Sequence, residues 1–215
     1  MPPDVDDEPE SPVARIDAPA PDFIARSTLG EVRLSAWRGR WIVLFSHPAD
    51  FTPVCTSEFV ALQRALPRFQ ALGCDLIGVS VDSLHAHIAW VMDIKARFGV
   101  EIGFPIVEDI SMAIGRAYGM IHRGSTSTAA FRSVFFIDAQ GLIRATLHYP
   151  MNIGRSVDEM LRVVAALQTA QRHNVSLPEG WRPGDPGMMP PPLDQREAAG
   201  RGGEAWYFTS TPLNP

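Results

Sequence analysis

Two short apolar runs, separated by a segment of helical length, constrain the fold of this chain more than any other feature. WIVLFS (Trp41 to Ser46) and DLIGVSV (Asp75 to Val81) are predominantly hydrophobic over the length of one strand, which is typical of strands buried on both faces. Residues Thr52 to about Leu72 form a helical stretch between them. Strand, helix and strand in this order indicate an α/β fold.

The next segments continue the alternation. A helix is predicted from Ser83, a favourable N-cap residue, to a stop at Gly99, and a weak strand is predicted from Phe104 to Val107. Two strands joined by an AQG turn, Ser133 to Asp138 and Leu142 to Tyr149, have the pattern of an antiparallel hairpin. These segments add a helix and three strands to the predicted α/β core.

The last predicted helix has the clearest signal. Ser156 and Glu159 have the S-x-x-E spacing of a capping box, which satisfies free backbone donors at a helix start. An apolar stripe follows at helical spacing: Val157, Met160, Leu161, Val164 and Leu167. Two strand–helix pairs followed by a hairpin and a helix have the order of a thioredoxin-like α/β sandwich, which is the predicted fold.

Composition divides the chain into three parts. Residues 1–15 are acidic and Pro-rich, and we expect a flexible leader that is neither a signal peptide nor a transit peptide. Residues 16–175 hold the predicted sandwich. Residues 176–215 are rich in Pro and Gly, without helical or strand periodicity, yet four aromatic residues lie there: Trp181, Trp206, Tyr207 and Phe208. We predict a C-terminal arm that packs on a partner subunit, with a disordered tail as the alternative.

Charge and residue counts exclude several classes of function. A net charge of −5 without any Lys/Arg block argues against nucleic-acid binding, and no run approaches ~18 apolar residues, so no membrane span is expected. Two cysteines, Cys55 and Cys74, are too few for a disulfide framework, which predicts a reducing cytoplasm.

The histidines do not have the spacing of a metal site. His85 and His87 are two residues apart on a predicted helix and do not share a face. Outside the Cys55 segment, the other histidines show no spacing typical of metal ligands: His122, His148 and His173. We therefore predict no metal.

Cys55 lies at the start of the predicted helix, where a cysteine is activated. Thr52 is a favoured N-cap residue and Pro53 a favoured first helical residue, which places Cys55 in the first turn. Free backbone N–H groups and the positive end of the helix dipole favour a thiolate there. A buried structural cysteine is the alternative, but it explains neither the cap nor the surrounding prolines.

The segment HPADFTPVC carries a resemblance to a known family. Pro48, Thr52 and Cys55 spell P-x-x-x-T-x-x-C, which is similar to the active-site motif of the peroxiredoxins, and the similarity extends from about Ala18 to the C-terminus. FRSVFFID and YPMNIGRSVDEMLR place Arg132 and Arg155 at the family's arginine positions. The WRPGD and PPP elements of the tail resemble the one-cysteine (1-Cys) subfamily, which has a long C-terminal extension.

This resemblance implies that Cys55 reduces peroxides without a metal or organic cofactor, in a homodimer that can assemble further, up to a decamer. Cys55 is then the nucleophile, and Arg132 stabilises both its thiolate and the leaving oxygen. The Thr52 hydroxyl either accepts from helix N–H groups or bridges thiolate and peroxide. Pro48 shields the thiolate from water, or is only a turn residue.

Three further residues have supporting roles in this hypothesis. Glu58, one turn after Cys55, would be costly beside a thiolate unless paired, so we assign it to orienting an arginine rather than to a solvated helix face. His47 either hydrogen-bonds near the pocket or makes a structural bond at the strand end. Arg155 is the second arginine of the resemblance.

Cys74 decides how the oxidised enzyme is recycled. A helix from Thr52 to near Leu72 rises ~1.5 Å per residue, which separates Cys55 from Cys74 by ~25 Å or more. A disulfide needs Cα atoms within ~7 Å, so the two cannot pair. We expect an external thiol, either a small thiol or a thioredoxin-like protein, to reduce Cys55, and we expect Cys74 to be buried.

Other functions fit the sequence less well than peroxide reduction. A thiol–disulfide oxidoreductase would need C-x-x-C, and Thr52 occupies the position of the second cysteine. A lipid hydrolase would need G-x-S-x-G, but WRGRW has Arg40 where the serine would stand. An oligomeric holdase chaperone, or a peroxide sensor with little turnover, remains the alternative.

Overall fold

The computed structural model describes residues 14–121, 128–201 and 205–213. All but the last two residues of the predicted acidic leader lie outside these ranges, as does His122. The chain divides into two compact units, Met1–Val157 and Asp158–Pro215. The predicted start of the arm at residue 176 lies within the second unit and stays a prediction.

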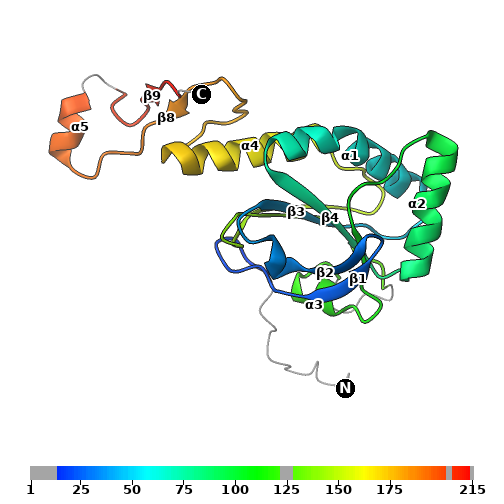
Figure 1. The fold of residues 1–215 in the computed structure, drawn as a ribbon. Helices are drawn as coiled ribbons and strands as arrows, with labels where there is room; N and C mark the ends of the chain where they lie inside the picture. The colour runs from blue at the N-terminus through cyan, green and yellow to red at the C-terminus, as the bar shows by residue number, and fades with distance from the viewer. Residues whose placement is uncertain (1–13, 122–127, 202–204, 214–215) are drawn as a thin grey trace, which may run out of the picture. The chain divides into compact units, whose positions relative to one another are not determined.

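A mixed sheet forms the first unit (Figure 1). Its described strands follow the order β2-β1-β5-β4-β3-β6-β7. The strands are β1 (Ile24–Ser27), β2 (Gly30–Arg33), β3 (Trp41–Ser46), β4 (Cys74–Ser80), β5 (Ile106–Glu108), β6 (Arg132–Ile137) and β7 (Ile143–Tyr149). Strands β3, β4 and β5 are parallel, whereas β6 is antiparallel to β3 and β7 is antiparallel to β6. The five predicted strands are therefore confirmed within two residues at each end. The β1–β2 hairpin was not predicted.

The surroundings of strand β3 explain why its sequence shows no alternation of apolar and polar residues. Ile42 and Leu44 belong to a buried core cluster that also includes residues of β4, β6 and β7. Phe45 instead packs against Phe59 of α1 at a ring-centroid distance of 5.5 Å. Because successive side chains of a strand point to opposite faces, both faces of β3 are covered, and each position needs an apolar residue.

Helices α1 (Pro53–Ala71) and α2 (Leu84–Phe98) pack on β4 and β5, and a 3-10 turn (Leu34–Trp37) and short α3 (Ala113–Ala117) complete the first unit. The predicted ends of α2 are confirmed. The Ser83 side chain accepts a hydrogen bond of 3.2 Å from the backbone N–H of Ala86, and Gly99 has a φ of 64°. That left-handed conformation favours glycine, so α2 ends there.

The second unit contains α4 (Val157–His173), β8 (Gly187–Met188), α5 (Gln195–Arg201) and β9 (Ser210–Thr211). Helix α4 begins directly after Ser156, as the predicted capping box requires. Residues 176–215 lack periodicity in the sequence, yet β8 and β9 pair in an antiparallel ladder and α5 lies between them in sequence. Trp181 is buried, and its ring N–H donates to the backbone carbonyl of Asp185 at 3.1 Å. None of the described helices is long and apolar enough to span a bilayer.

Candidate active site

Sheet topology brings three distant segments together at one end of the strands. Strand β3 ends at Ser46, and the loop after it leads into α1. Strand β6 runs antiparallel to β3, so its first residue, Arg132, lies beside the end of β3. Strand β7 runs back along β6 and pairs Tyr149 with Arg132, which returns the chain to the same end of the strands just before Met151 and Arg155.

The start of α1 places Cys55 and the N-cap residue Thr52 as predicted, but of the two roles open for the Thr52 hydroxyl, accepting from helix N–H groups is not seen. Thr52 is the N-cap residue with extended φ and ψ, Pro53 follows it, and Cys55 is fully buried in the first turn. No helix N–H group donates to the Thr52 side chain. Its hydroxyl instead donates to the backbone carbonyl of Ala49 at 2.9 Å, because the loop turns back beneath it. The Thr52 hydroxyl is therefore not the side-chain cap of α1.

Arg132 contacts Cys55 directly. Its Nη1 donates to Sγ of Cys55 at 3.3 Å and to Oε2 of Glu58 at 2.7 Å. Its Nε and Nη2 donate to the backbone carbonyl of Met151 at 2.9 and 2.6 Å. Four contacts to three residues fix a guanidinium that is only 2% exposed.

Glu58 joins the two arginines. Its Oε1 accepts from the backbone N–H and the Nε of Arg155 at 2.7 and 2.9 Å, and its Oε2 accepts from Nη2 of Arg155 at 2.8 Å. Burial by itself raises the pKa of Glu58, but hydrogen bonds and charge from Arg155, with the charge of Arg132, outweigh it and hold the pKa below its ordinary value. Glu58 is therefore an ionised carboxylate that orients both guanidinium groups.

Arg155 also ties the site to the sheet. Its Nη1 donates to the backbone carbonyls of Ser46 and Ser133 at 2.8 and 3.0 Å, and its guanidinium carbon lies 5.3 Å from the ring centre of Phe45. These contacts satisfy carbonyls at the ends of two adjacent strands. Arg155 makes no described hydrogen bond to Cys55. It is connected to Arg132 through Glu58, which accepts from both guanidinium groups.

Cys74 has a different environment. It begins β4, is fully buried, and pairs in register with Trp41 at the opposite end of β3 from the Cys55 loop. Burial, with a smaller effect from the neighbouring Asp75 charge, raises the pKa of the Cys74 thiol to about 12. Cys74 is thus a neutral, unreactive thiol in the ordinary pH range.

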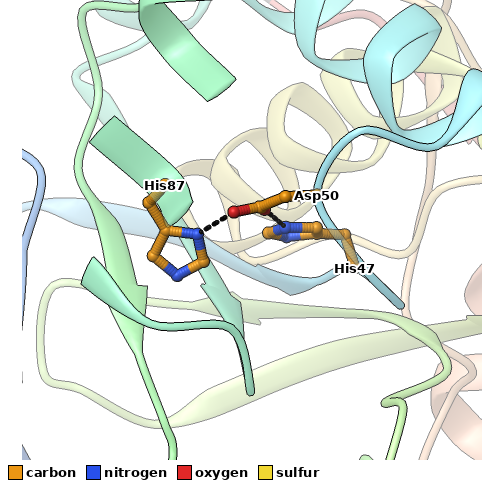
Figure 2. Close-up of side chains that lie close together, drawn as sticks. All are labelled: His47, Asp50 and His87. Carbon is orange, nitrogen blue, oxygen red and sulfur yellow. Dashed lines mark hydrogen bonds and ion pairs between the residues drawn. The ribbon is translucent and has the colours of Figure 1, made fainter. Parts of the chain in front are cut away.

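His47 lies in a cluster that sequence spacing did not reveal. Asp50 Oδ1 lies 2.8 Å from Nε2 of His47, and Asp50 Oδ2 lies 2.7 Å from Nδ1 of His87 (Figure 2). All three side chains are buried, and their donor atoms lie within 4.8 Å of one another, so among the described residues this group has the composition of a metal site. His85 is exposed and takes no part.

The distances in this cluster favour hydrogen bonds over a metal ion. Ligand atoms at about 2.0–2.2 Å from a tetrahedral ion lie about 3.3–3.6 Å apart, whereas the nitrogen–oxygen distances here are 2.7 and 2.8 Å. The outer ring nitrogens of His47 and His87 also have no hydrogen-bond partner in the described structure, although metal-bound imidazoles normally donate their second N–H. The prediction of no metal stays a prediction, supported by this geometry.

Comparisons with known proteins agree with this site. The model of the AhpC/TSA family matches residues 16–146, and the C-terminal domain of 1-Cys peroxiredoxin matches residues 166–204. Peroxiredoxin 2 of Caldanaerobacter subterraneus subsp. tengcongensis is 51% identical over 83% of this chain and 80% of the relative. The chain is a peroxiredoxin of the AhpC/TSA family. It is therefore a thiol-dependent peroxidase.

Solved peroxiredoxins share the fold. A yeast mitochondrial 1-Cys peroxiredoxin is 36% identical with a TM-score of 0.82, over 93% of this chain and all of that one. A cysteine-to-serine mutant of peroxiredoxin 6 from Arenicola marina is 32% identical with a TM-score of 0.82, over 93% and 98% of the two chains. Both the thioredoxin-like α/β fold and the resemblance to 1-Cys peroxiredoxins are confirmed by these matches.

The structure of this peroxiredoxin brings together most, but not all, of the predicted site residues. Cys55, Glu58, Arg132 and Arg155 form one hydrogen-bonded group. Pro48 and Thr52 lie in the loop before α1, with Pro48 buried. Sequence reasoning missed Asp50 and His87. Asp50 stands inside the quoted motif three residues after His47, a spacing that could have signalled a local pair, whereas nothing in the sequence links His87 to this loop.

Proposed function

We propose that Cys55 is the peroxidatic residue and that Arg132, Thr52 and Pro48 act on it directly. The observation that carries this proposal is the contact of Arg132 Nη1 with Sγ of Cys55 at 3.3 Å in a fully buried setting. Two guanidinium groups and the Glu58 carboxylate leave one uncompensated positive charge there. A thiolate at Cys55 brings the buried charge to zero, which avoids the large cost of an unpaired buried ion.

The chemistry follows from these positions. The Cys55 thiolate attacks one peroxide oxygen, the O–O bond breaks, and a sulfenic acid forms while the other oxygen leaves as hydroxide or alkoxide and takes up a proton. Arg132 stabilises that developing negative charge. The Thr52 hydroxyl, whose proton is directed to Ala49, accepts a hydrogen bond from the peroxide O–H. Pro48 has no N–H and shields the thiolate from water.

Recycling in this proposal needs an external thiol. That thiol attacks the sulfenic sulfur and releases water, and a second thiol then frees Cys55 from the mixed disulfide. Burial of Cys74 and its raised pKa support an external resolving group. The yeast 1-Cys relative is described as resolved via glutathione/thioredoxin systems, and we propose the same class of reductant, in a reducing cytoplasm, for this chain.

Peroxide without a thiol is expected to inactivate the enzyme by over-oxidation. With no second sulfur in reach, the Cys55 sulfenic acid persists, and further peroxide converts it to the sulfinic and then the sulfonic acid. Intact-mass analysis should show one oxygen after one equivalent of peroxide, then two and three in excess, with activity falling in parallel. Glutathione added after the first equivalent should return the original mass.

Two results would contradict this recycling scheme. One is a stoichiometric Cys55–Cys74 disulfide between chains on a non-reducing gel. The other is a sulfenic acid that disappears without added thiol and without gaining oxygen. Cys74→Ser provides the control, because it removes the only alternative sulfur of this kind and should give the same oxygen additions as the wild type.

We further propose that the arm packs on a second copy of the chain in a homodimer. Trp206, Tyr207 and Phe208 are 41, 62 and 67% exposed, and exposed aromatic clusters commonly mark interfaces. Replacing all three with aspartate should raise the dimer dissociation constant by at least about tenfold in sedimentation equilibrium. Leu29→Asp, at an exposed turn of the first unit, is the control. A wild-type chain that sediments as a monomer would refute the proposal.

A further inference from the structure

A cavity in the second unit contains none of the residues of the Cys55 site. Its volume is about 600 Å³, and it is lined by Glu159, Arg162 and Ala166 of α4 and by residues 177–182. The three helix residues are spaced by three and four positions, so they share one face of α4. All of the lining residues belong to the second unit, and the volume is typical of sites for small molecules. We call this cavity the Arg182 pocket.

One wall of the Arg182 pocket is held in place by Arg162. Its Nε and Nη2 donate to the two carboxylate oxygens of Glu159 at 2.7 and 2.8 Å, and its Nη1 donates to the backbone carbonyl of Trp181 at 3.1 Å. The ring of Trp181 is buried, and its N–H donates to the backbone carbonyl of Asp185. These bonds fix residues 177–182 against α4, so a ligand would not have to order this wall when it binds.

Two further charged groups line the pocket without a partner. The side chains of Glu179 and Arg182 make no hydrogen bond or ion pair with any other residue in the described part of the chain. A hydrogen bond from Arg162 is the largest cause that lowers the pKa of Glu159, and the positive charge of Arg182 adds to it. The hydrogen bond to Glu159 raises the pKa of Arg162, and the negative charge of Glu179 adds to it. Both unpaired charges therefore lie close to the ion pair of α4.

The pattern of charges selects the class of ligand. Two arginines and two glutamates give the pocket no net charge, so a simple anion meets repulsion from the glutamates and a simple cation meets repulsion from the arginines. A molecule that carries an ammonium and a carboxylate on the same carbon finds a partner for each. The planar guanidinium of Arg182 matches the two oxygens of a carboxylate, and the carboxylate of Glu179 accepts from an ammonium N–H.

We propose that the Arg182 pocket binds a small zwitterion with a free α-amino-acid end, with Arg182 as the partner of its carboxylate and Glu179 as the partner of its ammonium group. Two sources supply such an end: a free amino acid such as glutamate, and the γ-glutamyl residue of glutathione. The cavity has room for either of them. This proposal does not depend on the role of Cys55, so its test needs no peroxide turnover.

Trp181 provides a direct signal for this binding. The chain has five tryptophans, so a proton–nitrogen NMR spectrum of the full chain should contain five ring N–H signals, and Trp181→Phe identifies the one that belongs to Trp181. Glutamate should shift this signal and leave that of Trp90, buried in the first unit, unchanged. The dissociation constant should be on the order of 1 mM, because ion pairs close to solvent are weak. S-methylglutathione, whose sulfur cannot reduce Cys55, should shift the same signal.

Analogues of glutamate separate the two charged contacts. N-acetylglutamate lacks the ammonium group and glutamate α-amide lacks the α-carboxylate. Each should bind at least about tenfold more weakly than glutamate, since one charge-assisted hydrogen bond is lost. Inorganic phosphate should not displace glutamate. If S-methylglutathione binds at least about tenfold more tightly than glutamate, glutathione is the source of the ligand, and the reverse order identifies a free amino acid.

Substitutions in the pocket test which side chain holds which group. Arg182→Met and Glu179→Gln should each weaken glutamate binding at least about tenfold. Arg182→Met should not weaken binding of the α-amide further, and Glu179→Gln should not weaken binding of N-acetylglutamate further, because the matching contact is already absent. Arg172→Met is the matched control and should keep the wild-type affinity, since Arg172 is an exposed arginine of α4 outside the pocket.

Three outcomes would overturn the proposal. One is a Trp181 signal that neither glutamate nor S-methylglutathione shifts at concentrations well above the expected dissociation constant. Another is equal affinity for glutamate and N-acetylglutamate, which would leave Glu179 without a role. The third is an equal loss of affinity in Arg172→Met and Arg182→Met, which would show a general effect of charge. The analogue series uses the wild-type chain, so it decides the proposal even where a variant fails to fold. Absence of peroxide activity in the wild type would instead bear on Cys55 alone.

Discussion

Replacing Cys55 with serine is expected to abolish peroxide reduction, whereas replacing Cys74 with serine should leave most of the activity. A serine hydroxyl at physiological pH is a far weaker nucleophile than a thiolate and cannot form the sulfenic acid. Cys55 also has the guanidinium of Arg132 at 3.3 Å from its sulfur, while burial and the Asp75 charge keep Cys74 neutral. The two thiols therefore differ in environment rather than in exposure, since both are buried.

Stopped-flow loss of hydrogen peroxide, with glutathione as reductant, measures this difference. The rate of Cys55→Ser should fall to that of buffer, and far-ultraviolet circular dichroism should stay unchanged because serine is nearly isosteric. Peroxide turnover retained by Cys55→Ser would remove Cys55 from the centre of the mechanism. A loss of activity in Cys74→Ser with an intact fold would assign Cys74 a role that its environment does not suggest.

Replacing Arg132 with methionine is expected to slow the reaction of Cys55 with peroxide on the order of a hundredfold or more. Methionine keeps similar bulk but removes the donor that stabilises the leaving oxygen, and loss of one such donor costs about a hundredfold to a thousandfold. It also changes the buried charge around a Cys55 thiolate from zero to negative, because Arg155 alone then faces Glu58 and the sulfur. Both effects oppose the oxidation step.

Arg132→Lys and Arg97→Met sharpen the test. Lysine keeps the charge but cannot bond Cys55, Glu58 and Met151 together, so its rate should fall between those of the wild type and Arg132→Met. Arg97 has an exposed ion pair on α2 and serves as a control that should keep the wild-type rate. Thermal unfolding identifies variants that lose stability. A folded Arg132→Met with wild-type single-turnover kinetics would be incompatible with the proposed role.

Local signals in the sequence were sufficient for the central strands and the long helices of the fold. WIVLFS has the bounds of β3, since a strand covered on both faces leaves an unbroken apolar run. Ser83 and Gly99 marked the ends of α2 because their hydrogen bond and backbone conformation are local properties. The β1–β2 hairpin escaped prediction because its burial pattern is mostly exposed, so no apolar periodicity marks it.

Prediction of the site from the sequence was limited by contacts between segments that lie far apart in the chain. Thr52 and Pro53 located Cys55, because a helix start is encoded within a few residues. The sequence left two roles open for the Thr52 hydroxyl and could not choose between them, since the turn that brings the Ala49 carbonyl to it depends on the loop conformation. His87 lies 37 residues after Asp50, and only the pairing of β3, β4 and β5 brings α2 to this loop.

Arg155 contributes to the architecture of the sheet and to the chemistry of the site at the same time. One guanidinium group bonds the carbonyls of Ser46 and Ser133, where the β3–β6 ladder ends, and the Glu58 carboxylate that holds Arg132. It thus joins the ends of two strands and also holds the group that contacts the reactive sulfur. Loss of this one side chain would therefore cost both the free energy of folding and the alignment of the group that stabilises the reactive sulfur.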